Sequence, residues 1–458
     1  MAVNGQVITP DHPDYEQARQ IADPRFAAVR PAAVVRCAGT GDVRRTLAFA
    51  RTHRLPLHLR SGGHSYAGYS TGPGLVVDVS PLHHITVDAE LATVGAGATS
   101  GRVARELDAH ERIVPLGACP GVGIAGLTLG GGLGAVGRAY GLTMHNLREA
   151  EVVLADGRVV TCGPRSHPDL FWALRGAGAG NFGVVTRLRF ATHPAPELHS
   201  HVLVWTLPHA ARVVEAWQRW TPALPDTVSS QTVIQSARRR VIVTLVELHP
   251  PKPASPAPGY AAPLLDRLVD DIGAAPDLHH HTTSRYPRAI EFLREHTTPS
   301  AEGAPACQFH ADDLLTRPIP PHALPTFIGD FLTDPPPTHH LSLGIDLLGG
   351  AYDTGPPTAW AHRGCLFDLR YSITVTRPAQ MRTVLAARDR LCRLWAELRP
   401  VASGHSYQNH LWPALPDWQR AYYGPHVRRL RQIKAAYDPD NLFRFPHSLG
   451  SGILKKSL

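Results

Sequence analysis

The chain has 458 residues, of which 43% are hydrophobic and 18% are charged, with a formal net charge of +8; this excludes a disordered chain and leaves room for two to four domains. The positive charge is spread along the chain without a nucleic-acid-binding module, and no apolar run reaches the roughly 18 residues of a membrane span, so we expect neither nucleic acid nor membrane as a partner. Residues 1–20 lack the basic and apolar parts of a signal peptide, which predicts a cytoplasmic protein.

The first 195 residues alternate between strand and helix patterns. Short apolar runs predict strands, and apolar residues at helical spacing behind a capping residue predict helices. The mixed order of the two is typical of an α+β domain. The strands are expected at 32–36, 57–60, 75–79 and 92–96, the helices at 40–53 and 99–110, and a hairpin at 150–161.

The remainder of the chain is patterned differently. Strands are expected at 202–206, 240–248 and 365–372, and helices at 208–221 and 379–398. A proline-rich stretch at 249–263 predicts a loop, and Asp334–Pro337 predicts a second break. Aromatic residues and turn signals become dense again after residue 401.

Two glycine-rich loops carry the strongest functional signal. The first, Arg60–Ser65, follows a strand, and its small residues let successive backbone N–H groups turn toward an anion such as phosphate. The second runs from Gly117 to Gly126. Neither loop fits the dinucleotide fingerprint G-x-G-x-x-G after a strand, and neither ends in Gly-Lys-Ser/Thr, so a Rossmann site and a P-loop are both disfavoured.

Cysteines and histidines give no metal signature. The six cysteines form no C-x-x-C pair, and we expect five of them to be ordinary thiols, with Cys119 set apart by its glycine loop. The histidine runs at 83–84, 279–281 and 339–340 are interpreted as surface residues, because adjacent residues on a strand point to opposite faces. The sequence therefore predicts no metal site.

Nine motifs, taken in order, resemble the berberine-bridge-enzyme-like oxidases of the vanillyl-alcohol-oxidase superfamily. The resemblance implies a PCMH-type FAD-binding domain at 1–195, an inserted substrate domain at 196–400 with an antiparallel sheet covered by helices, and a C-terminal segment at 401–458 that returns to the FAD domain. The motifs are Arg60–His64, Val77–Ser80, Val94–Gly97, Gly117–Gly123, Arg138–Leu142, Asp169–Gly176, Asn181–Thr186, Tyr422–Gly424 and Tyr437–Phe443.

The resemblance also implies FAD held by two covalent bonds. His64 matches the histidine that binds the 8α-methyl carbon of the flavin, and Cys119 matches the cysteine that binds flavin C6. A neutral imidazole and a thiolate are suitable nucleophiles toward an oxidised flavin ring. Taken singly, His64 reads as an exposed side chain and Cys119 as a small buried one. The other cofactor-binding positions implied are Arg60, Ser61, Gly62, Gly63, Ser65, Gly117, Val122, Gly123, Gly126, Asn181, Gly183, Val185 and Asn409.

The reaction implied is base-assisted oxidation of an alcohol, in which hydride passes from a C–H bond to flavin N5 and O2 is reduced to H2O2. Val122 matches a position where a small residue accompanies oxidase behaviour. Tyr407-Gln-Asn-His410 resembles a family motif that ends in Tyr, so the base is open between Tyr407, which needs a depressed pKa, and His410, which titrates near neutrality. Either residue could equally be a packed or surface side chain.

Two further candidates lie on the strand expected at 365–372. Alternation places Asp368 and Arg370 on one face, where Arg370 can bind an anionic substrate or pair with Asp368, or the two can form an ordinary exposed pair. The main hypothesis is an oxidase acting with O2 on a bulky secondary metabolite or sugar-bearing natural product, as a monomer or homodimer. The alternative is a cyclase or isomerase that keeps FAD as a non-redox scaffold.

Overall fold

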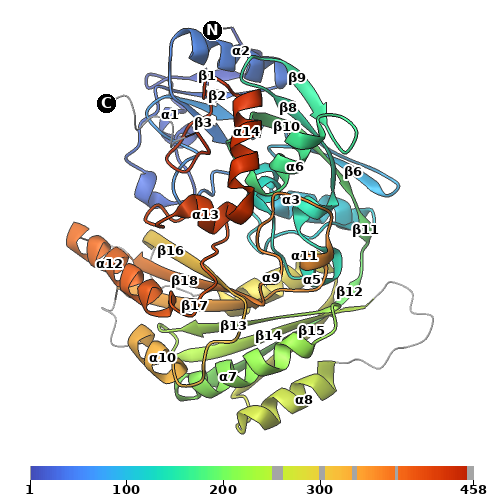
Figure 1. Cartoon of the computed structure of the whole chain (residues 1–458), viewed down its shortest axis with the longest axis vertical. Coiled ribbons are helices and arrows are strands. Elements are labelled where there is room, and N and C mark those ends of the chain that lie inside the picture. The colour runs from blue at the N-terminus through green and yellow to red at the C-terminus, as the bar shows by residue number, and fades with distance from the viewer. Residues whose placement is uncertain (1, 250–260, 299–304, 333–337, 377–379, 451–458) are drawn as a thin grey trace.

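A computed structural model describes residues 2–249, 261–298, 305–332, 338–376 and 380–450. The chain forms two halves that meet at a cavity, with the N-terminal half uppermost in Figure 1 and a large sheet below it. The loop expected at 249–263 lies mainly outside the described residues, and the break at 334–337 lies wholly outside them.

The N-terminal half opens with a four-stranded sheet. Its strands are β1 (Gln6–Ile8), β2 (Ala33–Arg36), β3 (Leu57–Arg60) and β4 (Leu75–Asp78), in the order β1-β2-β4-β3. β4 pairs in parallel with both β2 and β3, and helix α2 (Thr40–Thr52) provides the crossover between them. The strands and the helix expected in this region are confirmed.

A five-stranded antiparallel sheet completes this half. Its order is β5-β6-β10-β8-β9, and the hairpin expected at 150–161 is the β8–β9 pair. The helices beside it are α3 (Ser100–Ala109), α4 (Ile124–Gly130), α5 (Gly137–Tyr140) and α6 (Pro168–Ala177). The strands are β5 (Ile85–Asp88), β6 (Leu91–Gly95), β8 (Leu147–Val153), β9 (Val159–Cys162) and β10 (Val184–Ala191), with β7 (Arg112–Ile113) and β11 (His193–Pro194) paired separately.

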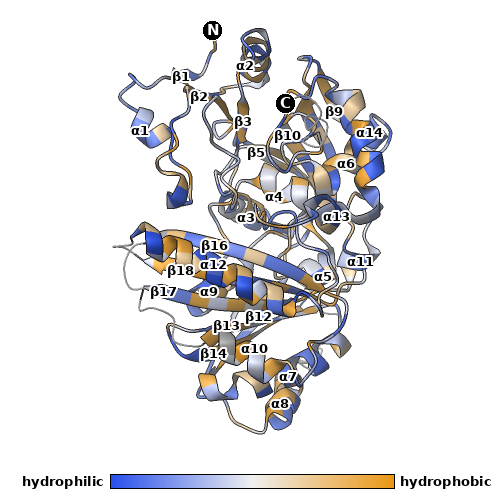
Figure 2. Ribbon diagram, turned by 60° about the vertical axis from the view of Figure 1, so that its left-hand side comes forward, coloured by the Kyte–Doolittle hydropathy of each residue, from blue (hydrophilic) through white to orange (hydrophobic). Residues whose placement is uncertain are grey.

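The second half is built on a seven-stranded antiparallel sheet in the order β15-β12-β14-β13-β17-β18-β16. Figure 2 shows β16, β17 and β18 side by side, with hydrophilic and hydrophobic residues mixed along each strand. The strands are β12 (Glu197–Thr206), β13 (Val228–Gln235), β14 (Arg240–His249), β15 (Leu278–Ser284), β16 (Pro305–Leu315), β17 (His339–Leu347) and β18 (Phe367–Thr376).

Helices cover the outer face of this sheet. Trp217 of α7 (Ala210–Trp220) packs on Phe367, and Phe327 of α10 (Leu324–Leu332) packs on Tyr371, both on β18. The helix α12 (Met381–Leu398) packs on β16 and β18, and α8 (Ala261–Ile272) packs on α7. Since Phe367 and Tyr371 face these helices, the alternate residues of β18 face the other half of the molecule.

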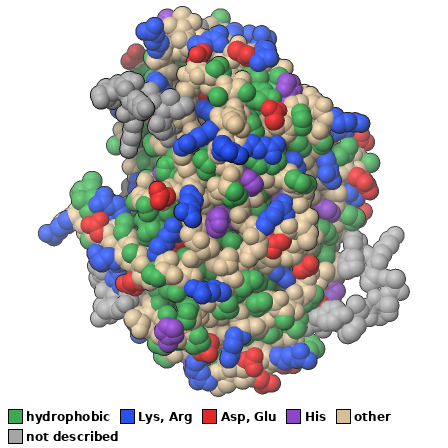
Figure 3. All heavy atoms as spheres, viewed as in Figure 1, with side chains coloured by type: hydrophobic (Ala, Val, Ile, Leu, Met, Phe, Trp, Pro, Cys, Tyr) green, Lys and Arg blue, Asp and Glu red, His purple; other side chains and the backbone are tan. Residues whose placement is uncertain are grey.

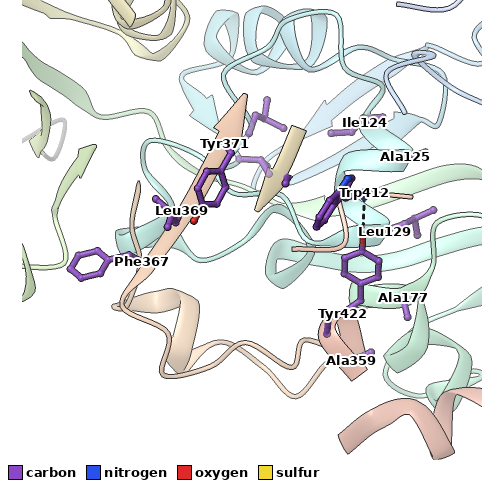
Figure 4. Packing of buried hydrophobic residues seen from close by; sticks show 14 of the residues in the cluster. Ile124, Ala125, Leu129, Ala177, Ala359, Phe367, Leu369, Tyr371, Trp412 and Tyr422 are labelled. Atoms are coloured by element: carbon purple, nitrogen blue, oxygen red, sulfur yellow. Dashed lines mark hydrogen bonds between the residues drawn. The ribbon is translucent and has the colours of Figure 1, made fainter. Parts of the chain in front are cut away.

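The remaining helices join the two halves. α9 (Tyr286–Thr297) packs on β12 and on α3, while α13 (Trp418–Tyr423) and α14 (Val427–Tyr437) return to the N-terminal half, where α14 packs on α6. One buried apolar cluster runs through both halves. Figure 4 shows part of this cluster, from Ile124 and Leu129 to Tyr371 on β18. The Tyr422 hydroxyl accepts a hydrogen bond from the backbone N–H of Trp412. The helices and mainly antiparallel sheets of the two halves confirm the predicted α+β class.

Two expectations about surfaces can be compared with the structure. On the face shown in Figure 3, basic side chains are interspersed with acidic and apolar ones. His339, expected at the surface, is only 4% exposed, because α12 lies against that end of β17; this expectation was wrong. In the part of the chain that the structure describes, no helix is long and apolar enough to cross a membrane.

Candidate active site

A cavity of about 860 Å³ lies between the glycine-rich loops of the N-terminal half and the inward face of the seven-stranded sheet. Thr244 and Val246 of β14 and Asp368 and Arg370 of β18 line its floor. Of the predicted cofactor and catalytic positions, all but one line it: Arg60, Ser61, Gly62, Gly63, His64, Ser65, Gly117, Cys119, Val122, Gly123, Gly126, Gly183, Val185, Asp368, Arg370, Tyr407, Asn409 and His410.

The two glycine loops touch each other. A Cβ atom on Gly62 would lie 2.3 Å from the Gly123 nitrogen, and one on Gly123 would lie 2.2 Å from Ser61 Oγ. Only glycine fits at either position. Ser61 Oγ donates to the Ala96 carbonyl over 2.7 Å, which ties this contact to the end of β6.

The backbone of the first loop presents donors to the cavity. Among the described residues, the N–H groups of residues 61–65 find no acceptor, and Gly63 has a left-handed φ of +68°. A run of unpaired N–H groups around such a turn is suited to bind an anion. The loop therefore fits the phosphates of FAD.

His64 and Cys119 stand on opposite loops and both face the cavity. The His64 ring lies beside Gly121 of the second loop, where a Cβ atom would come within 2.8 Å of His64 Nε2. Partial desolvation lowers the pKa of His64, which favours the neutral imidazole. Cys119 is exposed, whereas Cys37, Cys162, Cys307 and Cys365 are buried and Cys392 is intermediate.

The side chains of two predicted cofactor residues form hydrogen bonds with other parts of the protein. Arg60 is buried and its guanidinium contacts the carbonyls of Ala18 and Ser70, with Asp78 at 3.8 Å. Asn181 does not line the cavity; it is 1% exposed, and its side chain accepts from the Leu449 N–H over 3.0 Å. The prediction that Asn181 belongs to the cofactor site is therefore corrected, because the side chain holds the C-terminal segment.

The Tyr407–His410 motif enters the cavity against the triple glycine of residues 130–132. The Tyr407 oxygen accepts from the Gly132 N–H over 2.7 Å and from Asn409 Nδ2 over 2.8 Å. Burial raises the pKa of Tyr407 despite these bonds, so its hydroxyl stays protonated and can donate. The condition under which Tyr407 serves as base, a depressed pKa, is not met.

Asp368, Asp312 and His410 form a buried acid–base group. Their potential ligand atoms lie within 4.8 Å of one another, and His410 Nδ1 is 3.9 Å from Asp368 Oδ2. Asp312 accepts from Ser406 Oγ over 2.7 Å and from the Tyr407 N–H over 2.5 Å. With both Asp312 oxygens engaged, the group is better suited to share a proton than to bind a cation.

Burial dominates the protonation of this group. It raises the pKa of Asp368 to about 7, although Arg370 opposes the shift. Burial, together with Arg370 and His310, lowers the pKa of His410 well below its usual value, so the expectation that His410 titrates near neutrality was wrong. Asp368 is thus a cavity-lining carboxylate whose charge changes near pH 7; burial also raises the pKa of Asp313, which does not line the cavity, to about 7.

Arg370 is held chiefly by Asp346, which the sequence analysis missed. Their side chains meet at 2.7 Å, whereas Asp368 lies 3.9 Å from Arg370, and Gln231 donates to the second Asp346 oxygen over 2.6 Å. Asp346 sits directly opposite Asp368 in the β17–β18 register. The sequence around Asp346 did not indicate a site residue, because β17, the strand that carries Asp346, was not predicted.

An aromatic platform closes the site beside the first glycine loop. Tyr66, two residues after His64, stacks on His310 with ring centroids 4.1 Å apart and an interplanar angle of 20°. His310 Nδ1 is 2.9 Å from Ser372 Oγ. The position of Tyr66 directly after Arg60–Ser65 was a usable signal, whereas His310 lies on β16, a strand that was not predicted.

Comparison with known proteins identifies the family of this chain. Residues 31–163 match the family model described as an FAD binding domain, and residues 406–450 match the model described as berberine and berberine like. The chain is 32% identical to the uncharacterized FAD-linked oxidoreductase YgaK of Bacillus subtilis, over 98% of this chain and 97% of that protein.

Two further proteins resemble this chain along most of its length. The xylooligosaccharide oxidase of Thermothelomyces thermophilus is 29% identical over 92% of this chain and 87% of its own. The solved structure of Physcomitrella patens BBE-like 1 superposes with a TM-score of 0.87 at 24% identity, covering 98% of this chain and 97% of that chain.

Proposed function

This chain belongs to the berberine-bridge-enzyme-like FAD-linked oxidoreductases, and from that premise we propose that it is an oxidase with FAD held by two covalent bonds, acting on an alcohol of a sugar or sugar-bearing natural product. The observation that carries the proposal is the shared cavity: His64 and Cys119 face it from one side, and Asp368 and His410 from the other. A covalently fixed ring would then lie next to an acid–base group.

The chain's own residues hold the cofactor as follows. The unpaired N–H groups of residues 61–65 bind its phosphates, and the Gly62–Gly123 contact sets the distance between the two attachment loops. His64 and Cys119 would each hold the flavin ring through one covalent bond, and the two electrons and two protons released for each bond would pass to O2, giving H2O2. Two links leave the rest of the cavity open to a bulky substrate.

Asp368 takes the proton of the substrate hydroxyl. Its pKa near 7 gives a useful fraction of carboxylate at neutral pH and a basicity matched to the task. Neutral His410 orients the hydroxyl, and Tyr407 donates a hydrogen bond. When bound, FAD supplies the hydride acceptor and the route to O2, with H2O2 as the product.

The sugar assignment is supported by the lining of the cavity. Gln231, Asp346 and Arg370 present hydrogen-bonding groups on the sheet, and the Tyr66 ring offers an apolar face. Polar groups beside an aromatic face suit a ring with several hydroxyls. The relatives named as xylooligosaccharide and chitooligosaccharide oxidases act on such substrates.

Oxygen uptake with a panel of xylo-, chito- and other oligosaccharides and sugar-bearing aromatic compounds tests the reaction. We expect one H2O2 for each carbonyl formed. Product formation without O2 uptake would reject the oxidase and support the cyclase or isomerase alternative. A cytoplasmic location and a monomer or homodimer stay predictions, which cell fractionation and light scattering test.

Intact mass tests the attachment separately. The wild type should exceed 49.7 kDa by one FAD, less the hydrogens lost in two bonds. His64→Ala and Cys119→Ala should each retain one link and the double variant none. Cys392→Ala, at an intermediate-exposure cysteine that does not line the cavity, is the control and should keep both. Acid-stable flavin on the double variant would overturn the assignment.

A further inference from the structure

The cavity extends beyond the acid–base group along the seven-stranded sheet. Alternate residues of β18 line it from Asp368 to Thr374, a distance of about 20 Å along the strand. A single sugar ring is shorter than this floor. The cavity is therefore long enough for a substrate that carries further groups beyond the hydroxyl that is oxidised.

The far part of this floor is polar. Ser342 of β17 lies opposite Ser372 of β18 in the register, and Gln308 of β16 lies opposite Thr374 of β18. All four residues line the cavity, and Gln308 Nε2 donates to Thr374 Oγ1 over 3.2 Å. Hydroxyl and amide groups of this kind are suited to bind the hydroxyls of a second sugar unit.

Helix α9, which lies between the two halves in Figure 1, forms a wall of this part of the cavity. One face of α9 lines the cavity with residues at helical spacing, namely Ile290, Leu293, Arg294 and Thr297. The Thr297 carbonyl accepts from Gln235 Nε2 over 2.5 Å, and Gln235 lies opposite Ser342 in the β13–β17 register. This bond holds the last turn of α9, and Arg294 with it, beside the polar end of the floor.

The charge of Arg294 is not balanced by any carboxylate among the residues that the structure describes. Its side chain is exposed, and its guanidinium forms no ion pair or hydrogen bond there. The acidic neighbours on α9, Glu291 and Glu295, lie 2.6 Å and 3.7 Å from Arg288 instead. A free guanidinium in a cavity wall is suited to bind an anion, and its planar N–H groups match the two oxygens of a carboxylate.

The other arginines that line the cavity do not compete for such a group at this end. Arg60 and Arg370 have carboxylate partners within the protein. Arg444 lies on the cofactor side, because the next residue, Phe445, packs on Tyr69 with ring centroids 5.2 Å apart, and the Tyr69 N–H is bonded to the first glycine loop.

We propose that Arg294 binds a carboxylate on the part of the substrate remote from the oxidised hydroxyl, so that an acidic sugar unit such as a uronic acid is preferred over its neutral counterpart. This inference rests on the proposed oxidase function and narrows its substrate class. The sugar hydroxyls contact Ser342, Ser372 and Thr374 while the carboxylate contacts Arg294. The net charge of +8 attracts an anionic substrate in the same sense. Arg294 thus acts on substrate binding and not on the chemical step.

Paired oligosaccharides that differ in one charge test the proposal with the FAD-loaded protein. The probes are oligosaccharides of the xylo, gluco and chito series with a terminal glucuronic acid, each as the free acid and as its methyl ester. Binding is measured from the change in flavin absorbance, and turnover from O2 uptake. We expect the free acid of at least one series to bind about tenfold tighter than its ester, with a similar kcat. Equal affinity for acid and ester in every series would overturn the proposal.

Oxygen uptake separates a failure of this inference from a failure of the proposed function. Uptake with the esters, without any preference for the acids, would reject the role of Arg294 alone. Neither binding nor uptake with any probe in either form would reject the sugar oxidase and this inference together.

Variants on α9 locate the carboxylate. Arg294→Met should lose the preference through a higher KM for the acid, with the ester unaffected, whereas Arg294→Lys keeps a charge and should retain part of it. Arg288→Met, at an exposed arginine of the same helix that does not line the cavity, is the matched control and should keep the full preference. A preference that persists in Arg294→Met, or that is lost in Arg444→Met instead, would place the carboxylate elsewhere and reject the assignment.

Discussion

At the scale of single residues, Asp368, the base that we propose, lowers the stability of the folded protein. It is 1% exposed and has Asp312 beside it, so its charged form is disfavoured in the folded protein. A carboxyl with a raised pKa in the folded state lowers stability as pH rises from its unfolded pKa of about 3.9 through its folded pKa. At pH 8 the folded protein therefore bears the full cost of the charge.

Asp368→Asn should separate these two properties. Loss of the base should lower kcat by about 10²–10⁴-fold, while removal of the buried charge should raise the melting temperature at pH 8. At pH 5, where Asp368 is largely protonated already, the gain should be much smaller. Calorimetry at both pH values and oxygen uptake check this. Full activity in the variant would exclude Asp368 as the base.

The pH profile of the wild type gives an independent measurement. Because the ionised carboxylate is the active form, kcat/KM should rise with pH through about 7 and level off above it. Tyr407→Phe keeps Asp368 and should lower the rate without moving this midpoint. A rate that falls as pH rises through 7 would contradict the assignment.

At the scale of elements, we expect the contact between the two glycine loops to be required for cofactor binding. Gly62→Ala would place a methyl group 2.3 Å from the Gly123 nitrogen, so the loops must separate. We expect loss of most acid-stable flavin and a lower melting temperature. Gly39→Ala is the control, since nothing lies within 4 Å of its Cβ position and its backbone is extended. Equal flavin content in both variants would show that the loop contact is dispensable.

The helices and strands also show which features could be predicted from the sequence. Strands β2 and β4 and helix α2 were predictable because apolar spacing and capping are local, and His64 and Cys119 were found through the motifs around them. Strand β13 alternates weakly; it forms a hairpin with the neighbouring β14, but its pairing with β17 depends on residues more than 100 positions away. Asp312, Asp346 and His310 enter the site through that long-range strand order, so no local pattern marked them.

At the scale of the whole molecule, one arginine joins the two halves. Arg138 of α5 is 4% exposed and donates to the carbonyls of Val228 and Leu224 over 2.9 Å each, and also to that of Leu348. These acceptors lie at or beside β13 and β17, the strands that carry Gln231 and Asp346. The guanidinium therefore fixes the floor of the cavity relative to the cofactor loops.

Arg138→Met should loosen that junction while leaving both attachment residues in place. Three buried carbonyls would lose their donor, which costs on the order of 3 kcal/mol of unfolding free energy. We expect a melting temperature several degrees lower, retained acid-stable flavin and a reduced kcat, because Asp368 would no longer be held at a fixed distance from the ring. Arg158→Met is the matched control: its partner Asp156 is largely exposed, so little stability should be lost. If the two variants melted together, the position of the sheet over the cofactor loops would not depend on Arg138.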